Sequence, residues 1–273
     1  MSQTTQTDLI GFADVAERLP QLINKLPNIL TGLKQAYIRT PNTPAGLGLA
    51  FERAVKRNPY GDALLFENQR YSYKELNAWA NQIAHFYLSL GIKKGDVITV
   101  MIENRPELIA TVIALAKIGV TSALVNTSQT GKVLTHSVNL VNPVAIVVGE
   151  ECRAAVDEVR QDLNIASDRL HWFADQDTLK EPDGLFISIL VKTDYQAVIF
   201  TNSRWTLAYG TYGHILNLDE DDVMYCTLPL YHATGMVVCW CGVIAGGSAL
   251  AIRRKFSTCD FGQMEKFNRI AFG

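Results

Sequence analysis

Short apolar runs alternate along the chain with stretches in which apolar residues recur every three or four positions. The runs are rich in Val, Ile and Leu and predict strands, whereas the recurring stretches predict helices that cover them. The predicted strands span residues 63–67, 70–73, 97–101, 120–125, 144–148, 170–173, 196–200, 223–228 and 248–252. The predicted helices carry residues 76–90, 106–117, 132–140, 151–163 and 236–245. This alternation predicts an α/β fold with mostly parallel sheets flanked by helices.

Residues with special capping or backbone properties mark where several of these elements begin and end. Ser72, followed three residues later by Glu75, has the sequence pattern of a capping box at a helix start. Gly91 is placed to end that helix, and Pro106 to begin the next one. Gly119 lies just beyond the end of the second helix.

The N-terminal segment has a different pattern, because its apolar residues follow near-helical spacing with charges between them. The apolar positions are Leu9, Ile10, Phe12, Val15, Leu19, Leu22, Ile23, Leu26, Ile29, Leu30 and Leu33. Such an amphipathic segment either lies on a membrane surface or docks on its own domain. Pro20 and Pro27 divide residues 8–39 into short pieces, which weakens both interpretations.

Residues 233–252 contain no charged side chain and are long enough to cross a bilayer as a helix. Gly246 and Gly247 interrupt the stretch and divide it into a helix at 236–245 and a strand at 248–252. We therefore interpret it as a core helix and strand of an α/β domain, with a membrane span as the alternative.

Composition indicates an ordinary globular protein, with 48% hydrophobic and 19% charged residues among 273. The balance of 25 basic against 27 acidic residues argues against a nucleic-acid surface. The five cysteines lack zinc-site or redox spacing, which favours buried free thiols in a reducing cytosol. The first 20 residues lack the features of a secretory signal. We expect a cytoplasmic protein, peripheral at the inner face of the membrane if residues 8–39 bind lipid.

Five segments match, in the same order, the motifs of a known enzyme superfamily. They are FERAVKRNPYGDALLFENQRYSYKELNAWANQIAHFYLSLGIKKGD (51–96), ENRPE (103–107), ALVNTS (123–128), LPLYHATG (228–235) and RRKFS (253–257). The chain resembles adenylate-forming (AMP-binding) acyl-CoA synthetases, and among them the branch of very-long-chain acyl-CoA synthetases and fatty-acid transport proteins. The resemblance implies part of an N-terminal AMP-binding domain at residues 46–273, so the amphipathic segment at residues 1–45 is expected to precede it.

The resemblance further implies a two-step reaction that uses ATP, Mg²⁺ and CoA. A fatty acid and ATP give an acyl-adenylate and pyrophosphate, and the CoA thiol then displaces AMP. A loop rich in Gly and Ser/Thr must surround the triphosphate with backbone N–H groups and place a lysine beside it. Where the family reads something like Y-T-S-G-T-T-G-x-P-K, this chain reads FTNSRW (200–205), roughly a dozen residues shorter. We therefore expect no intact catalytic site and no cofactor bound by this chain.

Thr201, Asn202 and Ser203 are what remains of the nucleotide-binding loop if the resemblance holds. Arg204 either offers a charge to a phosphate or faces solvent in a shortened turn, and a lone arginine fixes no phosphate-binding geometry.

Four residues of the LPLYHATG motif are predicted to line the pocket for the acyl chain and the adenylate, by the same resemblance. They are Tyr231, His232, Thr234 and Gly235. The structural alternative is that Tyr231 packs in the core and His232 caps a helix start. The remaining histidines have no metal-like spacing and predict no metal site: His85, His136, His171 and His214.

Residues 269–273 predict the start of a further strand, and we expect a domain truncated in mid-sheet. The resemblance places a magnesium-binding glutamate, a ribose-binding aspartate and a catalytic lysine beyond these residues. The chain is then a catalytically incompetent copy of a long-chain fatty acid–CoA ligase, a residual module that binds a fatty-acyl chain or another subunit, or a decayed product that folds poorly. An acyl chain needs only an apolar pocket, whereas adenylation needs the triphosphate loop.

Overall fold

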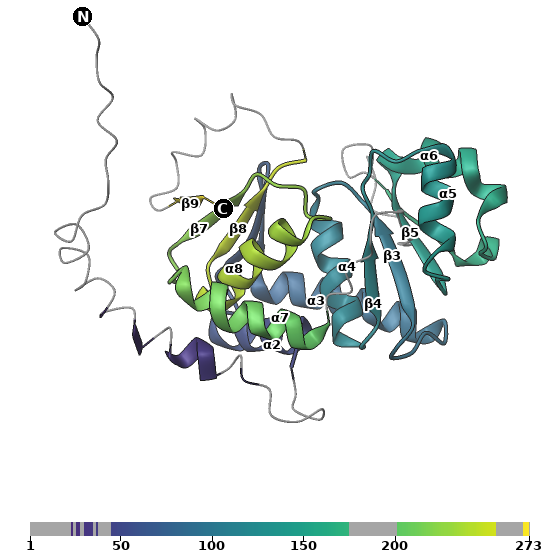
Figure 1. Cartoon of the computed structure of the whole chain (residues 1–273). Coiled ribbons are helices and arrows are strands. Elements are labelled where there is room, and N and C mark those ends of the chain that lie inside the picture. The colour runs from purple at the N-terminus through teal and green to yellow at the C-terminus, as the bar shows by residue number, and fades with distance from the viewer. Residues whose placement is uncertain are drawn as a thin grey trace, which may run out of the picture.

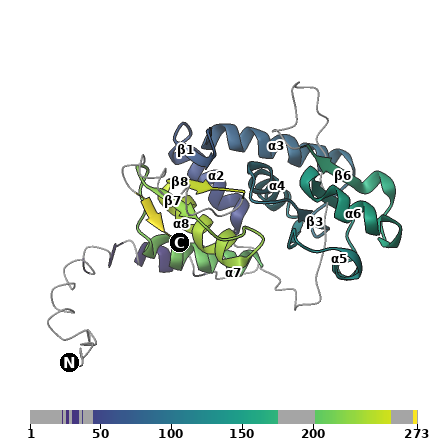
Figure 2. The ribbon, with the colours of Figure 1, turned by 90° about the horizontal axis from the view of Figure 1, so that it is seen from above.

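The structure, a computed structural model, describes residues 45–174 and 201–254, strand residues 270–272, and positions 23, 26–27, 30–34 and 37. Within these residues the strands form two sheets, with helices between them and on their outer faces (Figure 1). Seen from above in Figure 2, the long helix α3 (Tyr73–Ser89) reaches from one sheet to the other. One hydrophobic core runs through both halves, so the predicted α/β class with mostly parallel sheets is confirmed.

The first sheet has the order β2-β1-β8-β7-β9 and joins strands that lie far apart in the sequence. Its strands are β1 (Asp62–Phe66), β2 (Gln69–Ser72), β7 (Val223–Cys226), β8 (Ala249–Ile252) and β9 (Ile270–Phe272). β1 and β2 form an antiparallel hairpin, and the other neighbours are parallel. Leu64 in β1 pairs with Leu250 in β8, which fixes the register across this long separation.

The second sheet is entirely parallel and has the order β4-β3-β5-β6. Its strands are β3 (Val97–Met101), β4 (Thr121–Leu124), β5 (Ala145–Gly149) and β6 (Leu170–Phe173). From β3 the chain passes to β4 on one side and then returns to β5 on the other. The order of the strands therefore reverses between β3 and β5.

Helices cover both sheets. They are α2 (Leu47–Arg57), α3, α4 (Pro106–Lys117), α5 (Gly131–Asn139), α6 (Arg153–Val159), α7 (Asn202–Ala208) and α8 (Trp240–Gly246), with two π-helical segments, η4 (Tyr209–Gly213) and η5 (Thr234–Cys239), and three 3₁₀ turns, η1 (Glu150–Cys152), η2 (Arg160–Asp162) and η3 (Ser167–Arg169). α4 lies between the sheets and is buried at residues 106–115. A helix that is apolar all round belongs in a core, as α4 does.

Most predicted element boundaries are confirmed within one or two residues. The capping box is present: the Ser72 hydroxyl accepts from the Glu75 N–H at 3.2 Å, and the Ser72 N–H donates to Glu75 Oε2 at 2.8 Å. α4 begins at Pro106, as predicted. Gly91 and Gly119 follow the two helices with φ of 78° and 73°, backbone angles that favour glycine.

The helix predicted at 151–163 is confirmed but shorter than predicted, because only α6 is α-helical and the 3₁₀ turns η1 and η2 flank it. Residues 233–252 contain η5, α8 and β8, and Gly247 ends α8 with φ of 75°. No helix in the described part of the chain is long and apolar enough to span a bilayer. The predicted strand at 196–200 lies outside the described residues.

Four cysteines are buried free thiols, as predicted: Cys152, Cys226, Cys239 and Cys241. Cys259, the fifth, lies outside the described residues. His171 is buried in β6, where it stacks on Tyr87 and its Nε2 lies 3.1 Å from the Asp168 carbonyl oxygen. Burial lowers the pKa of His171.

Candidate functional site

The residues predicted to remain from the nucleotide-binding loop begin helix α7. Thr201 is the N-cap, and its hydroxyl accepts from the Arg204 N–H at 3.2 Å. Asn202 opens the helix, and its Oδ1 lies so near Gly46 that a Cβ there would come within 2.2 Å of it. Ser203 follows in the helix, and its side chain is not among those described. The chain thus enters a helix directly at this point.

The described residues around α7 do not fit a triphosphate. Phosphate cradles are built from several backbone N–H groups that point at one anion, commonly with a lysine beside them. In residues 201–254 the first glycine is Gly210, inside η4, and no lysine occurs. The Arg204 N–H, one of the N–H groups at the start of α7, is already bound by the Thr201 hydroxyl. This described segment is therefore a capped helix start without the glycines and the lysine typical of a phosphate cradle.

Residues 228–235, the acyl turn, follow β7 and lead into η5. Leu230 is fully buried, Tyr231 is half-buried, and His232 and Thr234 are exposed. The His232 N–H donates to the Pro229 carbonyl at 3.0 Å, and the His232 carbonyl accepts from the Met236 N–H at 3.1 Å. His232 thus joins the turn to η5 through its backbone, while its ring faces solvent.

Gly235 lets η5 approach the acyl turn closely. A Cβ on this buried residue would lie 2.9 Å from the Pro229 carbonyl oxygen, closer than side chains normally come to backbone. α7 also contacts η5, so the two groups of predicted residues lie on neighbouring elements. The two groups of predicted site residues therefore lie close together. Residues 228–235 form a compact turn, whereas residues 201–203 form the start of a helix.

A cavity of about 510 Å³ lies at the amino ends of β7 and β8, on the far side of these strands from the acyl turn. Its lining contains none of the predicted site residues; it consists of Arg57, Gly213, His214, Asn217, Leu218, Asp219, Glu220, Asp221, Ala245 and Gly246. Burial, and then the charge of Arg57, lower the pKa of His214.

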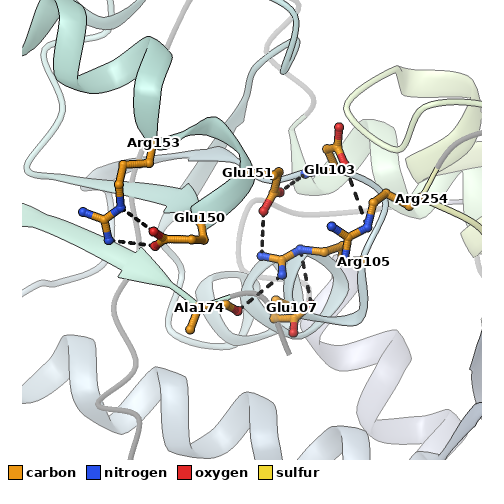
Figure 3. Close-up of polar contacts among 8 residues, drawn as sticks. All are labelled: Glu103, Arg105, Glu107, Glu150, Glu151, Arg153, Ala174 and Arg254. Atoms are coloured by element: carbon orange, nitrogen blue, oxygen red, sulfur yellow. Dashed lines mark hydrogen bonds and ion pairs between the residues drawn. The ribbon is translucent and has the colours of Figure 1, made fainter. Parts of the chain in front are cut away.

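A buried arginine lies at the carboxyl ends of the strands, where sequence reasoning assigned no role. Arg105 follows β3 and is 1% exposed. Its Nη2 lies 3.2 Å from Glu151 Oε2, its Nε lies 3.8 Å from Glu107 Oε2, and its Nη1 donates to the Ala174 carbonyl at 3.3 Å (Figure 3). Three elements of the second sheet therefore meet at one guanidinium.

Glu103 extends this ion cluster to the first sheet. Its N–H donates to Glu151 Oε1 at 2.8 Å, and its carboxylate lies 3.9 Å from Arg254, just after β8 (Figure 3). The same view shows Glu150 and Arg153, a more exposed pair joined by two hydrogen bonds of 2.5 and 2.7 Å. Of these two groups, the cluster around Arg105 is the one that links the two sheets.

The ion cluster fills the place where an open α/β sheet normally binds ligands, because it lies between the carboxyl ends of β3 and β5, where strand order reverses. Arg105 and Glu107 are almost fully buried there. Burial and the neighbouring Glu151 and Glu103 carboxylates raise the pKa of the Cys152 thiol to about 12. The second sheet thus closes its own crevice, and the acyl turn beside it is left as the candidate site.

The sequence identified ENRPE and RRKFS as motifs but did not predict the ion pairs that their residues form. The signal was present, because Glu103, Asn104 and Arg105 directly follow the buried strand β3 and polar residues at that position meet the carboxyl ends of neighbouring strands. Their partners Glu151 and Arg254 also follow strands directly.

Comparison with known proteins assigns the chain to a family. Residues 51–201, more than half of it, match the family model described as AMP-binding enzyme. The chain belongs to the AMP-binding enzyme family. This family is ATP-dependent, uses CoA and forms adenylates. The predicted resemblance is therefore confirmed at the level of the family.

Among curated relatives, the medium/long-chain-fatty-acid–CoA ligase FadD6 of Mycobacterium tuberculosis is 29% identical, over 92% of this chain and 45% of its own length. Long-chain fatty acid transport protein 6 of Mus musculus is 26% identical, over 80% of this chain and 40% of its own length. The chain thus spans less than half the length of these relatives. The solved o-succinylbenzoate CoA synthetase of Bacillus subtilis, with its acyl-adenylate intermediate, shares the fold with a TM-score of 0.61 at 17% identity, over 82% of this chain and 47% of that one.

Proposed function

We propose that this chain is a fatty-acyl-binding part of a fatty acid–CoA ligase fold that does not carry out ATP-dependent adenylation by itself. One observation carries the proposal: helix α7 begins, capped by Thr201, where the triphosphate loop is expected, while the neighbouring acyl turn is compact and hydrogen-bonded. The names of the relatives, fatty acid–CoA ligases and fatty acid transport proteins, support a long-chain fatty acid as the ligand.

The two steps of such chemistry make unequal demands on the protein. Binding an acyl chain requires apolar surface and a fixed turn near its carboxylate, which Tyr231, His232, Thr234 and Gly235 would provide. Adenylation also requires groups that stabilise the charge developing on the triphosphate, and loss of one such group typically costs about a hundredfold or more in rate. Thr201, Asn202 and Ser203 offer no such set, so binding is the activity we assign.

Two assays on the purified chain test this proposal. We expect no ATP–pyrophosphate exchange with palmitate or oleate, and saturable binding of a fluorescent long-chain fatty acid. Robust exchange by a clean preparation would overturn the assignment, and so would the absence of fatty-acid binding by the folded chain. Protease sensitivity together with absent binding would instead favour a decayed product that folds poorly.

We further propose that the segment at residues 1–45 is distinct from the AMP-binding domain and contacts anionic membranes. Five of its positions, spaced as on one helical face, are 48–69% exposed: Ile23, Leu26, Leu30, Leu33 and Tyr37. Gly32, on the opposite face, is buried, and a Cβ there would meet the Gly210 carbonyl and His214. The apolar face therefore points away from the domain on which the segment docks.

Charge complements this apolar face. Between Glu17 and Glu52 the sequence has four basic residues and no acidic one: Arg18, Lys25, Lys34 and Arg39. The helix that Gly32 contacts adds three exposed apolar side chains, Leu207, Tyr212 and Ile215. Apolar area flanked by basic side chains is the combination that binds anionic lipid surfaces.

Co-sedimentation with vesicles tests the membrane contact. We expect binding to vesicles that contain phosphatidylglycerol, weak binding to pure phosphatidylcholine, and loss of binding when residues 1–45 are deleted or when Leu30 and Leu33 are changed to Glu. Val133→Glu is the control, because Val133 is 56% exposed on α5, outside this segment. Unchanged sedimentation of the deleted form would assign membrane binding to another part of the chain.

A further inference from the structure

The β3–α4 turn, residues 102–105, connects a strand of the second sheet with the helix between the sheets. Each of its three polar residues points to a different neighbour. Glu103 pairs with Arg254 after β8, and Arg105 pairs with Glu151 after β5. The residue between them, Asn104, reaches the acyl turn. One short turn therefore contacts the carboxyl ends of strands from both sheets.

Asn104 holds the acyl turn by two hydrogen bonds. Its Nδ2 donates to the Leu228 carbonyl at 3.0 Å, and its Oδ1 accepts from the Leu230 N–H at 2.8 Å. These backbone groups flank Pro229, which has no N–H of its own. The carboxamide thus takes the place that a neighbouring strand would occupy, and it satisfies both polar groups of a segment that belongs to no strand.

The position of Leu230 determines where the candidate pocket residues lie. Leu230 is fully buried, Tyr231 follows it directly, and the His232 N–H binds back to Pro229 at 3.0 Å. The His232 carbonyl then starts the hydrogen bonding of η5 at Met236. A shift at the Asn104 contact would therefore move the side chains of the acyl turn together.

We propose that Asn104 is a positioning residue, which fixes the acyl turn for ligand binding from the β3–α4 turn of the other sheet. The ion pairs of Glu103 and Arg105 on either side hold the turn itself in place. The positioning role concerns the geometry of residues 228–235; its consequence for fatty-acid affinity rests on the proposed function.

The chain offers a matched control for this residue. Asn139, at the end of α5, makes the same pair of contacts elsewhere: its Nδ2 donates to the Asp162 carbonyl at 2.8 Å, and its Oδ1 accepts from the Asn164 N–H at 2.8 Å. Both asparagines are half-buried. Asn104→Ala and Asn139→Ala therefore remove the same kinds of hydrogen bond, a part-buried pair at the acyl turn and an exposed pair away from it.

Hydrogen exchange of the full chain, followed by mass spectrometry, tests the positioning role. We expect Asn104→Ala to speed amide exchange in peptides covering residues 227–236 by roughly tenfold or more, because two hydrogen bonds are lost. Asn139→Ala should speed exchange near Asn164 and leave residues 227–236 unchanged. Asn104→Asp, which keeps the acceptor for Leu230 and loses the donor to Leu228, should give an intermediate effect and keeps the test usable if the alanine variant folds poorly.

Titration with a fluorescent long-chain fatty acid tests the consequence for binding. We expect Asn104→Ala to raise the Kd roughly tenfold and Asn139→Ala to leave it unchanged. Unchanged exchange at residues 227–236 in Asn104→Ala overturns the positioning role, whether or not the chain binds fatty acid. If exchange responds and the wild-type chain binds no fatty acid, positioning stands and the proposed function fails. Equal Kd values for the two variants would show that the anchor is merely structural.

Discussion

Two segments of this chain lie on neighbouring elements, but only residues 228–235 match a motif of the family, and the two segments have different structures. Residues 201–203 form the capped start of α7, where the Thr201 hydroxyl accepts from the Arg204 N–H. The acyl turn, residues 228–235, is held from outside by Asn104 and lies next to the ion cluster around Arg105. One segment is capped by its own hydroxyl, and the other is anchored by a side chain that follows a strand of the opposite sheet.

The two segments differ in where the hydrogen-bond partners of their backbone come from. The acyl turn belongs to no strand, so its backbone groups depend on partners brought from elsewhere in the sequence. The start of α7 satisfies its own backbone with one hydroxyl. Substitutions in the anchored region should therefore have larger effects than substitutions at the α7 start.

Loss of the Arg105 guanidinium should have the largest effect. Arg105→Leu leaves the Glu107 and Glu151 carboxylates in a buried site without their partner, which typically costs about 3–5 kcal/mol in the free energy of unfolding. Urea denaturation measures this loss. Arg153→Leu is the control, because it breaks a more exposed pair with Glu150 and should cost about 1 kcal/mol or less. Equal losses in the two variants would show that the cluster around Arg105 is not a buried anchor.

Crowding at Gly235 should have the next largest effect. Gly235→Ala places a methyl group 2.9 Å from the Pro229 carbonyl oxygen, and overpacking of this kind typically costs about 1–3 kcal/mol. We expect lower thermal stability together with weaker fatty-acid binding. Thr234→Ala, at an exposed neighbouring position, should leave stability nearly unchanged. A stable Gly235→Ala variant would mean that η5 does not pack closely on the turn.

Loss of the α7 cap should have a smaller effect, confined to stability. Thr201→Ala removes the hydroxyl that accepts from Arg204 and should cost about 1 kcal/mol, whereas Thr201→Ser should keep most of the stability. Fatty-acid affinity should not change in either variant. A marked loss of affinity in Thr201→Ala would show that the two segments act as one site.

Acidification should have the smallest effect and should be independent of both segments. Burial lowers the pKa of His171 and His214 in the folded chain, so the unfolded chain binds more protons as the pH falls through about 6.5, the pKa of an unperturbed histidine. This contribution to stability is complete above that pH and is lost below it. The melting temperature should fall less between pH 7.5 and 5.5 in His171→Gln than in the wild type. An equal fall in both would exclude His171 as a source of the pH dependence.

The strands and helices of the second sheet could be predicted from the sequence because each is a local pattern with its own start and end signals. β3 and α4 have the predicted bounds, since a buried apolar run and an N-terminal proline are read without reference to the rest of the chain. The helix predicted at 151–163 is shorter because its ends adopt 3₁₀ turns, which share the helical spacing of apolar residues.

The long-range contacts could not be predicted in this way. The pairing of β1 with β8 joins residues almost 190 positions apart, such as Leu64 and Leu250, and no local pattern encodes it. The anchoring of the acyl turn by Asn104 has the same origin, because a single asparagine after a strand has many partners available until the fold is known. The sequence located residues 228–235 and the start of α7 as the two segments of interest, but not the contacts that distinguish them.

Titration of one preparation of the folded chain with Mg²⁺–ATP and with a fluorescent long-chain fatty acid tests the central claim most directly. We expect saturable fatty-acid binding and no binding of ATP, because the acyl turn is anchored and the described residues around α7 form no phosphate cradle. Magnesium-dependent binding of ATP would contradict it.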